Sequence, residues 1–205
     1  DASLEWYPNN DSVVYFGVFQ KSLDNFIGEI QYEDTTINGT FFNEAVTYVN
    51  LPSADVSGFE FNYQQALDFL PIDGFIAGFN YTGTDSEATT ADGRVIPLPH
   101  QSDWVWNAVL GYDQGPWDLR AVLSSRGEYL DEIRGDAGED RYVLEHTQLD
   151  LSAKYNLNGS LQIFADLKNA TDEPYRAVTR PDGIDRLEQF EEYGWSTVFG
   201  LRFTY

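Results

Sequence analysis

The chain has 205 residues, which is enough for one domain with a large buried surface. It contains no cysteine, which excludes disulfides and cysteine-ligated metals, and its formal net charge of −22 argues against a nucleic-acid partner because phosphates would be repelled. No apolar run reaches about 18 residues, so we expect no membrane-spanning helix. The acidic composition alone would suit a soluble protein, but barrel strands carry only one apolar face each, which average hydropathy does not reveal.

Apolar and polar residues alternate with a period of two along most of the chain, which is the period of a β-strand. In the clearest segment, from His146 to Tyr155, the odd-numbered residues from Thr147 onward form one apolar row. Most such segments are about ten residues long, the length that a tilted strand needs to cross a bilayer. In chain order we predict strands at residues 1–7, 12–22, 54–66, 74–84, 102–112, 117–127, 143–156, 160–169 and 195–205.

Short and long connections alternate between these strands. Outer-membrane barrels show this pattern, with short periplasmic turns and long extracellular loops, whereas a soluble sandwich has loops of mixed length at both ends. The long connections hold more than half of the 34 acidic residues. The short connections are residues 8–11, 67–73, 113–116 and 157–159, and the long ones are 23–53, 85–101, 128–142 and 170–194.

The first long connection contains two strand-like pieces, Phe26–Tyr32 and Ala45–Asn50, which predict a hairpin that extends above the membrane. The fold class is therefore an all-β, antiparallel up-and-down transmembrane barrel. Nine strands are an awkward number, because bacterial barrels usually have an even count and an open sheet would leave unpaired edges in hydrocarbon. Either one strand is missed or the chain is part of a larger barrel.

The last predicted strand, from Trp195 to Tyr205, resembles the assembly signal of outer-membrane barrels, in which apolar residues alternate up to an aromatic C-terminus. The apolar row would face lipid and its aromatic end would lie in the interfacial girdle. An ordinary edge strand that ends the chain is the alternative. The row consists of Thr197, Phe199, Leu201, Phe203 and Tyr205.

Four short segments resemble motifs of TonB-dependent receptors, and their order along the chain adds to the resemblance. The most specific is Asn169-Ala-Thr-Asp-Glu-Pro-Tyr175, which is similar to the Asn-Leu-Thr-Asp-x-x-Tyr segment of the last hairpin in that family, with Ala170 in place of the usual leucine. The other three are Gly58-Phe-Glu-Phe61, Arg126-Gly-Glu-Tyr-Leu130 and Glu192-Tyr-Gly194. The resemblance covers essentially the whole chain.

The resemblance implies a 22-strand barrel around an N-terminal plug domain, in the bacterial outer membrane. Residues 1–205 would be its C-terminal portion, with about nine strands, and the plug and the N-terminal strands would lie outside this chain. The implied function is import of an external small-molecule nutrient, driven by a TonB-type energy-coupling protein that acts through the plug. The implied partners also include outer-membrane lipid and the barrel-assembly machinery, and no cofactor is implied.

Aromatic and basic residues in the long connections are candidates for ligand contact, because tyrosine rings can stack on a sugar or another flat ligand. The alternative is that these tyrosines pack the loops against each other. The candidates are Tyr129, Tyr142, Tyr175, Arg176, Arg180 and Tyr193.

No catalytic set or metal site stands out in the sequence. The two histidines, His100 and His146, lie in different segments without ligand spacing. The acid-rich stretch from Glu128 to Arg141 could hold calcium, but its spacing does not match a twelve-residue calcium loop, and Arg134 and Arg141 could pair with the acids.

Two other classes of protein remain possible, a passive porin and a soluble all-β carbohydrate-binding or adhesion module; an enzyme is not expected. The transported substrate is open among iron chelates, cobalamin and oligosaccharides. The acidic and aromatic rim favours a carbohydrate or another organic ligand, since an anionic iron chelate would prefer a basic rim.

Overall fold

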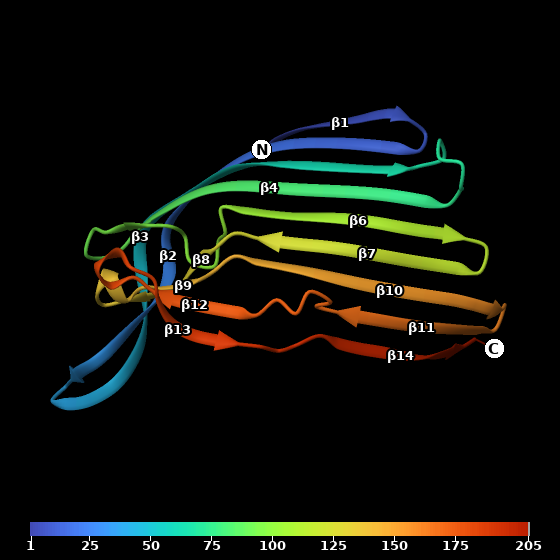
Figure 1. Ribbon diagram of the computed structural model, residues 1–205. Coiled ribbons are helices and arrows are strands. Elements are labelled where there is room, and N and C mark those ends of the chain that lie inside the picture. The colour runs from blue at the N-terminus through green and yellow to red at the C-terminus, as the bar shows by residue number, and fades with distance from the viewer. Residues whose placement is uncertain (205) are drawn as a thin grey trace.

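The computed structural model describes residues 1–204, in which nine long strands form one antiparallel sheet (Figure 1). Each strand pairs with the next long strand along the chain, as expected for an up-and-down barrel wall. All nine match strands predicted from the alternation. They are β1 (Ala2–Asn9), β2 (Ser12–Ile37), β3 (Thr40–Ala66), β4 (Phe75–Thr89), β6 (Trp104–Gln114), β7 (Trp117–Arg126), β10 (His146–Asn158), β11 (Leu161–Lys168) and β14 (Ser196–Phe203).

One face of the sheet is a continuous apolar surface, because the register places apolar side chains opposite one another on neighbouring strands. Phe61 of β3 lies opposite Tyr81 of β4, which in turn lies opposite Trp106 of β6. Side chains on this face are partly to largely exposed, up to 80% for Phe199, and within residues 1–204 no second layer covers them. An apolar face without a protein layer over it is what a membrane wall presents to lipid.

The opposite face carries polar side chains that bond to one another across the strands. Asn107 donates to Asn80 over 2.9 Å, and Lys154 of β10 lies 2.9 Å from Asp118 of β7. Lys168 of β11 makes a similar pair with Asp150 at 2.7 Å. A polar, hydrogen-bonded inner face is typical of the lumen of an outer-membrane barrel.

The two edges of this nine-strand wall are open. Within the described residues, β1 pairs only with β2 and β14 pairs only with β11. Because hydrocarbon does not tolerate unpaired backbone groups, such a wall is consistent with part of a larger barrel. Among residues 1–204, no helix is long and apolar enough to cross a membrane.

The expected hairpin in residues 23–53 is present as the continuation of β2 and β3. The ladder keeps one register from Ser12 opposite Gln65 to Ile37 opposite Thr40, and leaves out two positions, Asn25 across from Pro52 and Asp34 across from Asn43. Asn25 has a positive φ of 53° and proline cannot donate to a ladder, so the hairpin bends near this point (Figure 1).

The turn of the hairpin is the Asn38-Gly39 dipeptide. Both residues have a positive φ, 51° and 83°, as a type I′ turn requires. Asparagine followed by glycine is the strongest short signal for such a turn, and it keeps the two strands paired up to the tip of the hairpin.

The other long connections, predicted at residues 85–101, 128–142 and 170–194, contain regular structure that the sequence alternation does not indicate. They contain short strands and two 3-10 turns, which extend the sheet beyond β2 in the order β8, β9, β12 and β13. The β8 strand runs parallel to β2, with Ile133 opposite Ile30. The additional elements are β5 (Val95–Ile96), β8 (Tyr129–Arg134), β9 (Arg141–Val143), β12 (Tyr175–Thr179), β13 (Arg186–Glu191), η1 (Ala137–Glu139) and η2 (Pro181–Gly183).

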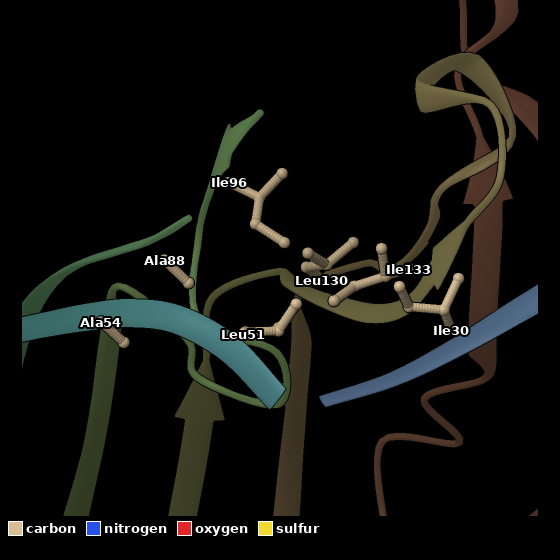
Figure 2. Packing of buried hydrophobic residues seen from close by; sticks show 7 residues of the cluster. All are labelled: Ile30, Leu51, Ala54, Ala88, Ile96, Leu130 and Ile133. Carbon is tan, nitrogen blue, oxygen red and sulfur yellow. The ribbon is translucent and has the colours of Figure 1, made fainter. Parts of the chain in front are cut away.

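The main cluster of fully buried apolar side chains lies among these connections rather than in the wall. Leu51 and Leu130 are 0% exposed, and Figure 2 shows the side chains of Ile30 and Ile133 meeting between β2 and β8. Three of the long connections contribute to this cluster, and residues 170–194 join them through the pairing of β12 with β9. We call the four connections together the loop cap (residues 23–53, 85–101, 128–142 and 170–194). The cluster consists of Ile30, Leu51, Ala54, Ala88, Ile96, Leu130 and Ile133.

Candidate functional site

Arg134 at the end of β8 ties three parts of the loop cap together. Its guanidinium lies 2.6 Å from Glu188 of β13, 2.9 Å from Glu132 of β8 and 3.3 Å from Glu33 of the β2–β3 hairpin. Burial disfavours the charged guanidinium, but the hydrogen bonds with Glu188 and Glu132 outweigh that cost, so the pKa of Arg134 is raised. Arg134 therefore stays charged and links carboxylates of the hairpin, β8 and β13 by ion pairs.

Arg141 of β9 makes a second clamp beside the first. Its Nη1 lies 2.5 Å from Asp131 and 3.3 Å from Glu132, and its Nη2 donates to the Tyr175 hydroxyl over 3.3 Å and to Gln189. The pairing predicted for Arg134 and Arg141 with the acids of their own segment is confirmed. The bonds that reach β12 and β13 were not anticipated.

Asp140 joins the connection after β4 to this network. Its carboxylate is only 3% exposed, accepts the backbone N–H of Arg134 over 2.7 Å, and pairs with Arg94 at 3.0 Å. Arg94 also donates to the backbone carbonyl of Arg134 over 2.8 Å. Burial raises the pKa of Asp140, since removing a carboxylate from water disfavours its charged form.

Two of the predicted ligand-contact residues, Tyr142 and Arg180, lie against each other. The Arg180 guanidinium is 4.6 Å from the centre of the Tyr142 ring, and it makes two 2.9 Å bonds to Glu128 and one of 2.7 Å to Asp185. These bonds with Glu128 raise the pKa of Arg180, and burial raises the pKa of the Tyr142 hydroxyl. Cation–π contact and ion pairing hold this arginine in place.

The other candidate residues occupy different surroundings. Tyr129 stacks under the guanidinium of Arg126 at 4.7 Å, and Arg176 pairs with Glu173 at 3.3 Å. Tyr175 is half-buried and bonded to Arg141, whereas Tyr193 is 72% exposed in the segment before β14. Tyr129, Tyr142 and Tyr175 thus belong to three adjacent strands of the cap, and each contacts an arginine, which is Arg126 of β7, Arg180 and Arg141 respectively.

The predicted assembly row on β14 lies on the lipid-facing side of the wall. Phe199 is opposite Ala165 and Leu201 is opposite Ile163, both on β11. Tyr205 lies outside the described residues, and the role of the row as an assembly signal stays a prediction. The described members of the row are Thr197, Phe199, Leu201 and Phe203.

A groove of about 590 Å³ lies between the hairpin and β8, and no sequence pattern indicates it because its walls come from three distant segments. At its rim, the Nδ1 atom of His100 lies 3.4 Å from Asp131. His100 has a positive φ of 62°, and its backbone N–H donates to the carbonyl of Leu130. The lining residues are Leu23, Phe26, Ile27, Gly28, Glu29, Gln31, Tyr48, Leu98, Pro99, His100, Asp131, Glu132 and Ile133.

Most acidic side chains between Glu128 and Arg141 form ion pairs with arginines. Within residues 1–204, no group of three or more histidine or acidic side chains is placed to hold a metal ion. The calcium interpretation of this stretch therefore gains no support from the described geometry.

Comparison with known proteins places these features in a family context. Residues 1–170 match the model of a family described as "TonB dependent receptor-like, beta-barrel". A probable TonB-dependent siderophore receptor, PiuA of Acinetobacter baumannii, is 22% identical over 178 residues, which are 79% of this chain and 22% of that protein.

Solved structures show the same fold. The crystal structure of PiuA superposes with a TM-score of 0.63 at 19% identity, over 98% of this chain and 27% of PiuA. The copper transporter OprC gives 0.69 at 14% identity (99% and 31%), and the ferric-catecholate import receptor Fiu of E. coli K12 gives 0.64 at 16% identity (97% and 26%). The chain thus spans less than a third of the length of each of these proteins.

Proposed function

Because the chain belongs to the TonB-dependent receptor family, we propose that it forms the C-terminal part of an outer-membrane receptor barrel that imports a nutrient. Receptors of this family are transporters of the bacterial outer membrane, not enzymes. The missing partners are then the N-terminal barrel strands and a plug domain, through which a TonB-type protein supplies energy. The barrel-assembly machinery and outer-membrane lipid are the further partners that this proposal requires.

The observation that carries the proposal is the combination of a two-faced wall with a packed loop cap at one end. A soluble carbohydrate-binding module buries its alternating aromatic side chains in its own core. The row Phe61, Tyr81 and Trp106 instead lies on the outer face of the wall, where it would contact lipid. A passive porin would share the wall but not the family match. The cap supplies a fixed polar and aromatic surface at the extracellular mouth, which suits selection of a ligand.

The charge of the cap favours a neutral or cationic organic ligand, such as an oligosaccharide, over an anionic one. Every arginine in the cap has a carboxylate within 4 Å, and the cap contains no lysine. Arginines that are already paired offer less attraction to an incoming anion, while the surplus of acids repels it. The candidate contacts on this surface are Tyr129, Tyr142, Tyr175, Arg176, Arg180 and Tyr193.

Ferric siderophores are the second candidate substrate class. They are favoured by the similarity to PiuA, a probable siderophore receptor, and by the likeness to Fiu, a ferric-catecholate import receptor. In that case the plug and the N-terminal loops would have to supply the positive charge that the loop cap of this chain lacks.

Growth of a strain that lacks the receptor gene tests the proposal and separates the two substrate classes. We expect the deletion strain to lose growth on one oligosaccharide or other neutral or cationic nutrient in a panel of sole carbon sources. Re-introducing the receptor should restore growth only while the TonB-type protein is intact. A defect confined to iron-limited medium with ferric siderophores would support the second substrate class. Normal growth in both panels, or uptake that does not need TonB, would refute active import.

A further inference from the structure

On the lipid-facing side of the wall, a depression of about 400 Å³ lies where β7, β10 and β11 run side by side. A second depression of about 310 Å³ lies on the same face across β4, β6, β7 and β10. The floor of the first depression is formed by Ala153 and Ala165, which lie opposite each other on β10 and β11. Two residues further along each strand, Tyr155 is opposite Ile163, and both line the first depression. Trp117 lies in the same row and also lines this depression, and the lining is completed by Lys154 and Phe164, which alternate with this row so that their side chains lie on the inner face.

Large side chains surround the alanine floor on two sides. Toward the short turns, the Trp117 and Tyr155 rings meet edge to face with centroids 4.6 Å apart. Toward the loop cap, the next pair on the same face is Leu151 opposite Leu167. The small side chains between these rows therefore leave an open recess with an aromatic wall on one side.

Parts of the receptor outside this chain would not cover the recess. Missing barrel strands would join the wall at its open edges, β1 and β14, whereas β7, β10 and β11 already have neighbours on both sides. A plug would lie against the polar inner face, which carries the Lys154–Asp118 pair on these same strands. The outer surface of a membrane barrel contacts lipid, so hydrocarbon must fill the recess.

The position of the recess along the strands indicates which leaflet of the membrane it faces. Trp117 is the first residue of β7 and follows the short turn at Gly115 and Pro116. The alanine pair lies one row further into the membrane, about 7 Å along the strand. Since short turns are periplasmic and aromatic residues mark the interface, the recess lies in the periplasmic half of the hydrocarbon layer.

We propose that this recess is a binding site for one acyl chain of a phospholipid in the periplasmic leaflet. Lipid tails and apolar side chains attract each other through packing rather than through the hydrophobic effect in this medium. A chain that lies over the alanines gains dispersion contacts with the Trp117–Tyr155 wall and with Ile163. Leucine side chains at the alanine positions would occupy the same space.

Native mass spectrometry of the intact receptor tests the site. The receptor is reconstituted in phosphatidylethanolamine vesicles, extracted in mild detergent, and compared with the double variant Ala153→Leu/Ala165→Leu. Ala108→Leu is the matched control, because Ala108 lies on the same face, opposite Leu123, and outside the lining of the recess. We expect the unmodified receptor and the control to retain one phospholipid, and the double variant to show at least tenfold lower occupancy.

Equal phospholipid retention in the three proteins would overturn the site. A receptor dimer that the double variant abolishes would also overturn it, because a second copy would then occupy the recess. Retention of lipopolysaccharide in place of phospholipid from mixed vesicles would contradict the leaflet assignment. The inference rests on the proposed function, since the recess faces lipid only in a membrane barrel. Failure to fractionate with the outer membrane would overturn both, whereas normal fractionation and nutrient uptake with unchanged lipid retention would overturn the acyl-chain site alone.

Discussion

Gly58 in β3 occupies a point where neighbouring strands come too close for a side chain. A Cβ atom at this position would collide with the carbonyl oxygen of Gly83 in β4 and would lie 2.5 Å from the ring of Phe19 in β2. A flexible ring can move away, but a carbonyl held in a ladder cannot. The glycine of the Gly58-Phe-Glu-Phe61 motif is thus explained by backbone contact.

We predict that Gly58→Ala destabilises the folded barrel by roughly 1–3 kcal/mol, as overpacking does in other close-packed sites. The measurement is the temperature at which the intact receptor loses its compact, heat-modifiable band in gel electrophoresis. Gly78→Ala is the matched control in β4, because the nearest atom to its Cβ would be 3.7 Å away. Equal effects of the two substitutions, or rescue of Gly58→Ala by Phe19→Ala, would contradict a clash with the backbone.

At the scale of elements, the β2–β3 hairpin cannot be stabilised by its own contacts alone. Beyond the bend at Asn25 it carries exposed apolar residues such as Ile27 and Tyr48, and an isolated two-stranded hairpin is marginally stable in water. The parallel pairing with β8 and the cluster around Leu51 and Leu130 stabilise the half of the hairpin that is nearest the wall. The hairpin and β8 should therefore open together.

Leu130→Ala tests this dependence. Removing a fully buried leucine side chain costs about 2–5 kcal/mol, and here the loss should lower the free energy of opening of the loop cap. Hydrogen exchange measured by mass spectrometry should speed up in β8, β9 and the hairpin, while β6 and β7 in the wall stay protected. Leu187→Ala, at a position 63% exposed in β13, should leave all of these rates nearly unchanged. Unaltered exchange in the hairpin of Leu130→Ala would show that the cluster does not hold it.

At the scale of the whole molecule, the structure consists of a membrane wall and a cap in which all four long connections are linked. Arg134 bonds to carboxylates of three elements, and Arg94 and Asp140 add the connection after β4. A half-buried charge network of this kind is specific in geometry even where its net contribution to stability is modest. The cap should therefore behave as one body at the mouth of the barrel.

Distances between spin labels on Glu44→Cys in the hairpin and Ile184→Cys near β13 measure this behaviour, and the chain has no cysteine of its own to compete for the label. We expect a single narrow distance distribution in the labelled receptor and a broader one after Arg134→Met. Arg186→Met is the control, because Arg186 and Asp182 are 3.6 Å apart and both largely exposed, where ion pairs contribute little. A broad distribution already present with Arg134 intact would mean that the connections move independently.

The nine wall strands, their two faces and the alternation of short and long connections can be predicted from the sequence alone. These features depend on local periodicity and turn chemistry, which each segment carries alone. The family was indicated by the resemblance of four short motifs. The Asn38-Gly39 turn was also readable from the sequence, although the hairpin was predicted only from its strand-like pieces. The pairing of Arg134 and Arg141 with nearby acids was predictable for the same reason.

The architecture of the loop cap follows from tertiary packing. Apart from the hairpin, its strands are two to six residues long, too short for a periodic pattern, and β8 pairs in parallel with a segment about a hundred residues away in the chain. The Arg134–Glu188 bond joins residues 54 positions apart, among many acids that could equally have served as partner. Alternation specifies which side of a strand is apolar, but the choice among distant partners is made by the packing of the whole chain, which also created the groove and the lipid-facing recess.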